Sequence, residues 1–325
     1  MNFSQLGMKI GILAMGLAVT ALGADEPKVT GVKAAQRPFG DISPVATIEV
    51  GGRPDWMVLT EDAVWVQNGK SRVIHRIDPQ TNREVARIEC PGEPDSGLAA
   101  GFGFIWVPLV GAKPGLIGIN PRTNRIERTF PIAPADAEGG IATSEDSIWM
   151  TSDPHGPLLR INPDTGEIRQ RIAVPPGSVN PIRVGPHIWV TSLEANVITC
   201  IDARSGEPLA QVPTGPKPRF STTDGRFLWV LAQGDGSVTK IDLQTRRAVA
   251  TIPLRVPGGG GEICTGAGAV WVTMLDLPLT KVDAATDRVL AQWIGPGGDS
   301  VRYGFDSIWL TDLRGGKLLR FKPAP

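Results

Sequence analysis

The chain has 325 residues, of which 41% are hydrophobic, and its 33 basic residues balance 33 acidic ones. A formal charge of zero provides no long-range attraction for nucleic acid or an anionic membrane surface, so we expect neither as a partner. The length alone would suggest two domains, whereas the repeats described below favour one closed unit.

Residues 1–24 have the layout of a secretory signal peptide. Lys9 precedes an apolar run of 13 residues, Ile10–Leu22, and small residues follow up to Ala24. The run is short for a membrane span. A buried N-terminal helix is the alternative, but a propeller has no place for one. We therefore expect a periplasmic or secreted protein without a membrane span in its mature chain. Residues 25–43 are expected to form an extended leader that wraps the outside or stays flexible.

The segment Pro44–Val50 is an isolated predicted strand. Its sequence, PVATIEV, resembles AVATIPL at Ala248–Leu254, where that pattern ends a repeat unit. No other part of a repeat precedes it. The role of this segment therefore depends on the array that follows.

Seven tryptophans define that array. They recur at steps of 41, 43, 40, 40, 42 and 38 residues in settings such as AVWVQ, SIWMT and AVWVT. The first repeat is predicted to contain four short strands, at Trp56–Thr60, Ala63–Gln67, Arg72–Ile77 and Glu84–Glu89. A period near 40 with four short strands is typical of one antiparallel propeller blade. The tryptophans are Trp65, Trp106, Trp149, Trp189, Trp229, Trp271 and Trp309.

The seventh repeat ends without a fourth strand. After Trp309 and the predicted strand Lys317–Phe321, the chain stops at Pro325. We predict that Val45–Val50 completes this blade, with Val45, Ile48 and Val50 buried, because the alternative leaves an unpaired strand edge. The expected fold is an all-β, seven-bladed β-propeller of four-stranded antiparallel blades over residues 44–325, closed by the N-terminal strand.

A second repeated motif follows the third strands. It reads DPQTN, NPRTN, NPDTG, DARSG, DLQTR and DAATD in successive repeats. Asp and Asn in such turns accept hydrogen bonds from nearby backbone amides. We therefore expect these acids to be structural, and we expect the tryptophans to be core residues between blades.

The three cysteines are predicted to be isolated thiols. Cys90, Cys200 and Cys264 belong to blades one, four and six, too far apart for disulfide bonds. They form neither a C-x-x-C motif nor a Cys/His cluster, so metal binding through sulfur is not expected.

The connections that enter the first strands are the predicted binding mouth. They share one rim with the second-to-third connections, and binding sites in propellers gather at mouths and channels. Small neighbours such as Gly97, Gly140 and Gly261 leave space there. The candidate residues in these connections are Arg53, Asp55, Trp56, Asp95, Asp136, Glu138, Asn180, Lys217, Arg219, Phe220, Glu262, Asp299 and Arg302. Arg183 and Tyr303 are candidates deeper along the first strands, where they could help to hold a small polar ligand.

The W-V-T strands, the I-D-P-x-T-G turns and the V-A-T-I-P strands resemble the bacterial YVTN-type and virginiamycin B lyase-like propellers. The resemblance covers about residues 44–323. For the lyases it implies a histidine base near the channel and Mg²⁺ held by acidic residues of the later blades. No histidine follows His187, and of the three histidines only His155 lies on the predicted functional rim. His155 is therefore the one catalytic candidate.

Two classes of function remain open at this point. The first is a monomeric binding module, without a cofactor, for a small polar ligand or a protein partner at the rim. A partner could contact an apolar lip formed by Leu109, Val110, Leu193, Met274, Leu275, Leu277 and Pro278. The second is a metal-dependent lyase or lactone hydrolase, in which Glu138, Glu262 and Asp299, with the Asn180 amide, would offer oxygen ligands to Mg²⁺ or Ca²⁺.

Overall fold

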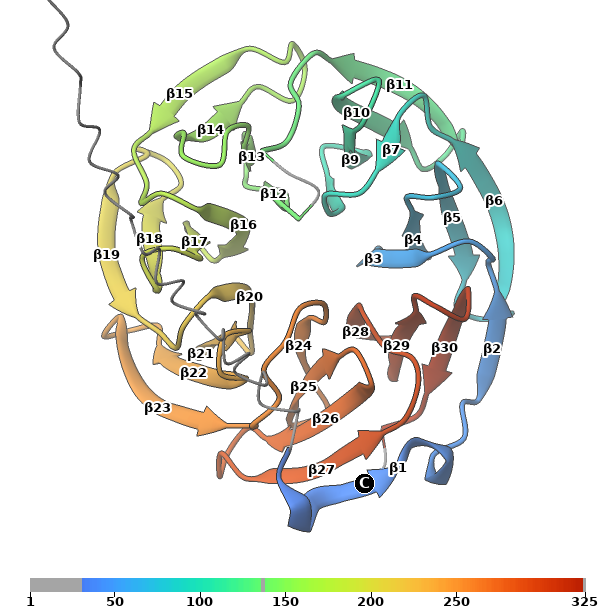
Figure 1. The fold of residues 1–325 in the computed structure, drawn as a ribbon. Coiled ribbons are helices and arrows are strands. Elements are labelled where there is room, and N and C mark those ends of the chain that lie inside the picture. The colour runs from blue at the N-terminus through green and yellow to red at the C-terminus, as the bar shows by residue number, and fades with distance from the viewer. Residues whose placement is uncertain (1–30, 136–137, 324–325) are drawn as a thin grey trace, which may run out of the picture.

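Seven sheets stand around a central axis in the computed structural model, which describes residues 31–135 and 138–323 (Figure 1). Within each sheet, antiparallel strands follow one another from the axis outward. This confirms the predicted all-β, seven-bladed propeller. Within the described residues, no helix is long and apolar enough to cross a membrane.

The first four blades follow each other in chain order. The inner strand of blade two is in two pieces, which both pair with the same neighbour. The strands are β3 (Pro54–Leu59), β4 (Val64–Asn68), β5 (Val73–Asp78) and β6 (Arg83–Glu89) in blade one; β7 (Glu93–Pro94), β8 (Ala99–Gly101), β9 (Phe104–Val110), β10 (Gly115–Asn120) and β11 (Arg125–Phe130) in blade two; β12 (Ala142–Thr143), β13 (Ile148–Thr151), β14 (Leu158–Ile161) and β15 (Ile168–Ile172) in blade three; and β16 (Ser178–Val184), β17 (His187–Ser192), β18 (Val197–Asp202) and β19 (Pro208–Pro213) in blade four.

The remaining blades continue the same pattern. In blade one, the observed strands differ from the predicted ones by one or two residues at their ends. The strands are β20 (Pro218–Thr223), β21 (Phe227–Ala232), β22 (Ser237–Asp242) and β23 (Arg247–Pro253) in blade five; β24 (Ile263–Gly266), β25 (Ala269–Met274), β26 (Leu277–Asp283) and β27 (Val289–Ile294) in blade six; and β28 (Val301–Gly304), β29 (Ser307–Asp312) and β30 (Lys317–Phe321) in blade seven.

The ring is closed by the N-terminal strand β2 (Ala46–Glu49). It pairs antiparallel with β30, with Ala46 opposite Arg320 and Glu49 opposite Lys317. Ile48 and Val50 are buried, as predicted. The prediction for Val45 was wrong, because this residue precedes the strand and its side chain is 55% exposed.

The segment before β2 runs along the outer edge of blade six. Strand β1 (Gln36–Pro38) pairs parallel with β27 and adds a fifth strand to that sheet (Figure 1). The 3₁₀ turns η1 (Lys33–Ala35) and η2 (Phe39–Asp41) flank it. The backbone N–H of Val32 donates to Oε1 of the buried Gln292 over 2.5 Å. The predicted signal peptide lies outside the described residues.

The seven repeat tryptophans form a buried layer between blades, since each is at most 2% exposed. In five blades a basic residue stands opposite the tryptophan in the register and covers its ring, at 4.6 to 5.6 Å from the centroid. Arg160, for example, lies over Trp149 and donates to the backbone oxygen of Arg204 in the next blade. Blades two and four have Gly118 and Cys200 at this position. The layer therefore joins packing within a blade to hydrogen bonds between blades.

The turns after the third strands are held by their own acids and amides. Asp78, Asp202, Asp242 and Asp283 each accept backbone N–H donors two or three residues later. These bonds hold the pKa of all four carboxyls below the ordinary range. The structural role predicted for the turn acids is thus confirmed.

Candidate functional site

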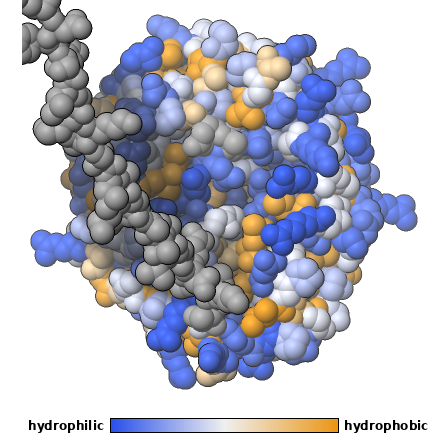
Figure 2. Space-filling model, viewed as in Figure 1, coloured by the Kyte–Doolittle hydropathy of each residue, from blue (hydrophilic) through white to orange (hydrophobic). Residues whose placement is uncertain are grey.

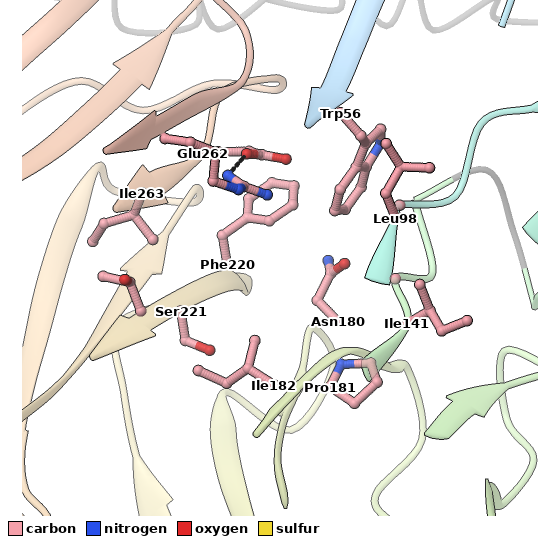
Figure 3. Close-up of a pocket in the computed structure, with 14 residues that line it drawn as sticks. Trp56, Leu98, Ile141, Asn180, Pro181, Ile182, Phe220, Ser221, Glu262 and Ile263 are labelled. Atoms are coloured by element: carbon pink, nitrogen blue, oxygen red, sulfur yellow. Dashed lines mark hydrogen bonds and ion pairs between the residues drawn. The ribbon is translucent and has the colours of Figure 1, made fainter. Parts of the chain in front are cut away.

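The first strands and the connections that enter them place two groups of side chains near the axis. One group lines a cavity of about 420 Å³ at the mouth and includes Arg53, Asp55, Asp95, Glu138 and Asp299. The other group lines a deeper cavity of about 200 Å³ (Figure 3). Its polar and aromatic members are Trp56, Asn180, Phe220, Ser221, Thr222, Glu262 and Arg302.

Six residues of the deeper site belong to one tier of the propeller. In every blade, the residue nine positions before the repeat tryptophan lies in or next to the first strand, close to the axis. These seven positions carry Trp56, Gly97, Gly140, Asn180, Phe220, Glu262 and Ser300. Equivalent positions thus carry two aromatic rings, two glycines, an amide, a carboxyl and a hydroxyl. The two glycines stand where neighbouring tier residues pack against the backbone.

Three irregular strands bring the large members of this tier toward the axis. The register shifts between Pro54 and Met57 in β3, between Val179 and Ile182 in β16, and between Pro218 and Phe220 in β20. Bulges of this kind bend a strand and redirect its side chains, and they are frequent beside functional sites. The remaining first strands pair with their neighbours without such a shift over the residues described.

The rings of Trp56 and Phe220 meet across the axis. They come from blades one and five, which are not neighbours, yet their centroids lie 5.4 Å apart in an edge-to-face arrangement. Gly97 leaves room for the Trp56 ring, and Gly140 leaves room for Asn180. A side chain on Gly97 would touch the Trp56 ring, and one on Gly140 would collide with Asn180. The pair gives the small cavity an aromatic wall.

Asn180 is held in an unusual backbone conformation. Its φ is +53°, a left-handed value that costs most residues energy and that asparagine tolerates better than most. Its side chain is 4% exposed, and its amide points into the space between Trp56 and Phe220 (Figure 3). Within the described residues, neither Oδ1 nor Nδ2 has a hydrogen-bond partner.

Other buried polar atoms of the same cavity are also unpaired. Among the described residues, none bonds to the indole Nε1 of Trp56, the hydroxyl of Ser221 or Oε1 of Glu262. A buried polar atom without a partner costs about 1–3 kcal/mol, so native proteins contain few of them. Several such atoms around one cavity indicate that a bound molecule or water completes their hydrogen bonds.

Glu262 and Arg302 form a buried ion pair at the cavity wall. Oε2 of Glu262 accepts from the guanidinium of Arg302 and, at 2.7 Å, from the hydroxyl of Ser300. Burial raises the pKa of Glu262, while the Arg302 charge opposes that increase. The pair leaves the deeper cavity with little net charge.

The mouth contains the carboxyls of Asp55 and Asp299, which hydrogen bond to each other. Burial raises the pKa of Asp55 well above its ordinary value, and the charges of Asp299, Glu138 and Glu262 add to this increase. Asp299 also accepts from the backbone N–H of Gly261 over 3.1 Å. Burial and their mutual repulsion therefore both favour the neutral form of this pair.

Asp95 and Glu138 are the other acids of the mouth. Burial raises the pKa of Asp95 to about 6 and that of Glu138 to about 7, although nearby arginines counteract it. Arg219 lies 3.8 Å from Glu138. The charge of the mouth therefore changes near neutral pH.

The predicted metal ligands lie near one another, but each is engaged by another side chain. Glu138 faces Arg219, Glu262 is bonded to Arg302, and Asp299 is bonded to Asp55. Over residues 31–135 and 138–323, no group of three or more His, Cys, Asp or Glu side chains has the arrangement of a metal site. These residues therefore do not fit Mg²⁺ or Ca²⁺ in this conformation.

Some predicted site residues lie away from the cavity. Arg183 is at the opposite rim, where it binds Glu145 over 3.1 Å, and Tyr303 packs between blades six and seven against Gly266. His155 is 68% exposed and pairs with Glu194. Lys217 is exposed on the rim. Asp136 lies outside the described residues.

Of the seven residues of the predicted apolar lip, Val110, Leu193 and Leu275 are partly exposed and the other four are not. Leu109, Met274, Leu277 and Pro278 are buried, because they face the neighbouring blades instead of solvent. Figure 2 shows one end of the propeller, where hydrophilic side chains surround scattered hydrophobic ones. The cavity also has lining residues that sequence reasoning missed, among them Ser221. The fixed offset from each tryptophan would have added Ser300 to the candidates but not Ser221.

Comparison with protein-family models and with curated protein sequences gives no match. Among solved structures, the chain is similar to one described as a streptogramin B lyase structure. The two share 18% identity with a TM-score of 0.70, over 85% of this chain and 96% of the other. The similarity supports the resemblance to the virginiamycin B lyase-like propellers. At this identity, what it shows is a shared seven-bladed fold.

Proposed function

We propose that this chain is an exported propeller that binds a small polar ligand in its axial cavity. The observation that carries the proposal is the set of unpaired polar atoms of Trp56, Asn180, Ser221 and Glu262 around one cavity. Their unmet hydrogen bonds lower the stability of the free protein, and a matching ligand would recover that free energy. Shape and complementary polarity are sufficient for such binding.

A small ligand explains the site better than a protein partner does. The unpaired atoms belong to buried residues that line a cavity of about 200 Å³, where a protein surface could not reach them. Four residues of the proposed contact lip are buried. The left-handed backbone of Asn180 also directs its side chain into the cavity and not toward the rim.

A screen of small polar compounds against the purified protein tests this function, by thermal shift and by ligand-observed NMR. A ligand that binds only the folded state raises the melting temperature by mass action. Trp56→Phe and Asn180→Asp should abolish that increase. Trp293→Phe in the outer strand of blade six and Asn124→Asp in a turn are matched controls and should keep it. Absence of any hit, or binding that survives both cavity variants, would contradict the proposal.

Acid–base catalysis at the mouth is the second candidate, as a lyase or a lactone hydrolase. It is favoured by the hydrogen-bonded Asp55 and Asp299 and by the raised pKa of Glu138, since perturbed acids cluster at catalytic sites. The related fold belongs to a protein described as a streptogramin B lyase. Turnover of streptogramin B or of lactones, with and without Mg²⁺ or Ca²⁺, and its loss in Asp299→Asn would support catalysis. No turnover by the wild-type protein would reject it.

A further inference from the structure

The unpaired atoms of the deeper cavity form a defined set of donors and acceptors. Trp56 Nε1 and Asn180 Nδ2 are donors, whereas Asn180 Oδ1 and Glu262 Oε1 are acceptors. The Ser221 hydroxyl can act in either role. A complementary ligand therefore offers two acceptors and two donors of its own.

We propose that this cavity takes a cyclic ureide, a flat ring with two N–H groups and two C=O groups, such as uracil or hydantoin. The proposal rests on the proposed function and names the ligand class of the same site. Each part of the ring has a counterpart in the cavity wall, as the following steps describe.

The amide of Asn180 matches one N–H and one C=O group that are adjacent on the ring. A side-chain amide presents a donor and an acceptor side by side, and asparagine uses this edge to bind adenine bidentately in nucleic acids. The terminal torsion of asparagine has a broad energy profile. Both amide atoms can therefore turn to the ligand at little cost while the backbone of Asn180 keeps its position.

The second N–H and the second C=O meet different residues. Oε1 of Glu262 accepts the N–H, while its Oε2 remains bonded to Arg302 and Ser300. The indole N–H of Trp56 donates to the C=O. Both side chains are at least nine-tenths buried, with exposures of 3% for Glu262 and 6% for Trp56. Hydrogen bonds at these positions would be shielded from water, which strengthens them.

The size and walls of the cavity favour a single flat ring. An apolar cavity of roughly 150 Å³ is known to hold benzene, and this cavity measures about 200 Å³. Trp56 and Phe220 provide aromatic surfaces, and Leu98 and Ile141 provide aliphatic ones (Figure 3). Because Arg302 balances the charge of Glu262, a neutral ring fits better than an ion.

Isothermal titration of the purified protein with uracil, hydantoin, glutarimide and benzene tests the ligand class. Glutarimide has both carbonyl groups but one N–H, and benzene has neither. We expect saturable binding of uracil or hydantoin, at least tenfold weaker binding of glutarimide, and none of benzene. Asn180→Asp, which keeps the acceptor and loses the donor, should weaken binding at least tenfold. Trp56→Phe should act in the same direction, and Trp293→Phe should have no effect.

The outcomes separate this inference from the proposed function. If neither ureide binds but another compound does so through Asn180 and Trp56, the ligand class is wrong and the binding function stands. If no compound binds, both are wrong. Uracil binding that is unchanged in Asn180→Asp and Trp56→Phe would place the ligand elsewhere and overturn the inference, provided that both variants melt as the wild type does.

Discussion

The tryptophan layer and the axial tier both contain buried aromatic and polar residues. They differ in the hydrogen-bond partners of the polar atoms. In the layer, Lys240 covers Trp229 and its ammonium group donates to Ala284 O and Asp287 Oδ1 of the next blade. In the axial tier, Trp56 and Asn180 are equally buried, yet their polar atoms lack partners among the described residues. Six of the seven tryptophans of the layer donate their indole N–H to a protein oxygen, and Trp189 is the one that lacks such a partner among the described residues. Burial of an aromatic residue therefore does not by itself distinguish core from site.

The largest expected effect is the loss of stability when a tryptophan of the layer is replaced. Trp229→Ala should lower the free energy of unfolding by roughly 3–5 kcal/mol, because it leaves a large cavity between blades. Trp56→Phe should change it far less, since an aromatic ring still faces Phe220. Urea unfolding of both variants measures the difference. A Trp229→Ala protein with wild-type stability would remove the distinction between layer and tier.

Ring closure should have the next largest effect. Deleting residues 1–51 removes β2 and exposes the partners of Ile48 and Val50, each worth about 1.5–3 kcal/mol when fully buried. Deleting residues 1–43 removes β1 but leaves β2, so its cost should be clearly smaller. Melting temperatures of the two truncated proteins compare them. Equal values would show that β2 is not what seals the ring.

A single basic residue of the layer should matter less than a tryptophan. Arg160→Ala loses the hydrogen bond to Arg204 O and the contact with Trp149, and we expect a loss of about 1–3 kcal/mol in unfolding free energy. Arg171→Ala, an exposed position in the same blade, is the control and should stay within about 0.5 kcal/mol. Similar losses for both variants would indicate that the layer adds no specific stability.

The acids of the mouth and the acids of the turns should respond oppositely to pH. This is the smallest of the expected effects on stability. Asp95 and Glu138 have raised pKa values of about 6 and 7, so the folded state binds more protons than the unfolded state from about pH 4 to pH 7. Their contribution to stability therefore falls as the pH rises through this window. Asp95→Asn should flatten that decline in melting temperature.

The turn acids provide the matched contrast for the pH experiment. The pKa of Asp78 is lowered by backbone hydrogen bonds, so its contribution is present above the unfolded pKa and is lost as the pH falls through the folded value. Asp78→Asn should flatten the acid side of the profile and leave the neutral side unchanged. A decline near neutral pH that is the same in Asp95→Asn as in the wild type would show that the axial acids do not cause it.

The sequence by itself determined the architecture of this protein. The spacing of the tryptophans, the turn acids such as Asp78 and the isolated segment Pro44–Val50 were enough to predict seven blades and their closure. These signals are local, because a strand, a turn and a repeat are each encoded within about 40 residues. Val45 was misplaced because strand ends depend on the neighbouring strand and not on alternation alone.

Only the tertiary structure decided which candidates form the site. Trp56, Asn180 and Phe220 come from three blades and meet because bulges redirect their strands toward the axis. Arg183 was predicted at the same depth but lies on the opposite rim, paired with Glu145. No local pattern encodes a bulge or the packing of one blade across the axis from another. The composition of the cavity wall is therefore a property of the closed ring, where residues distant in sequence share one small space.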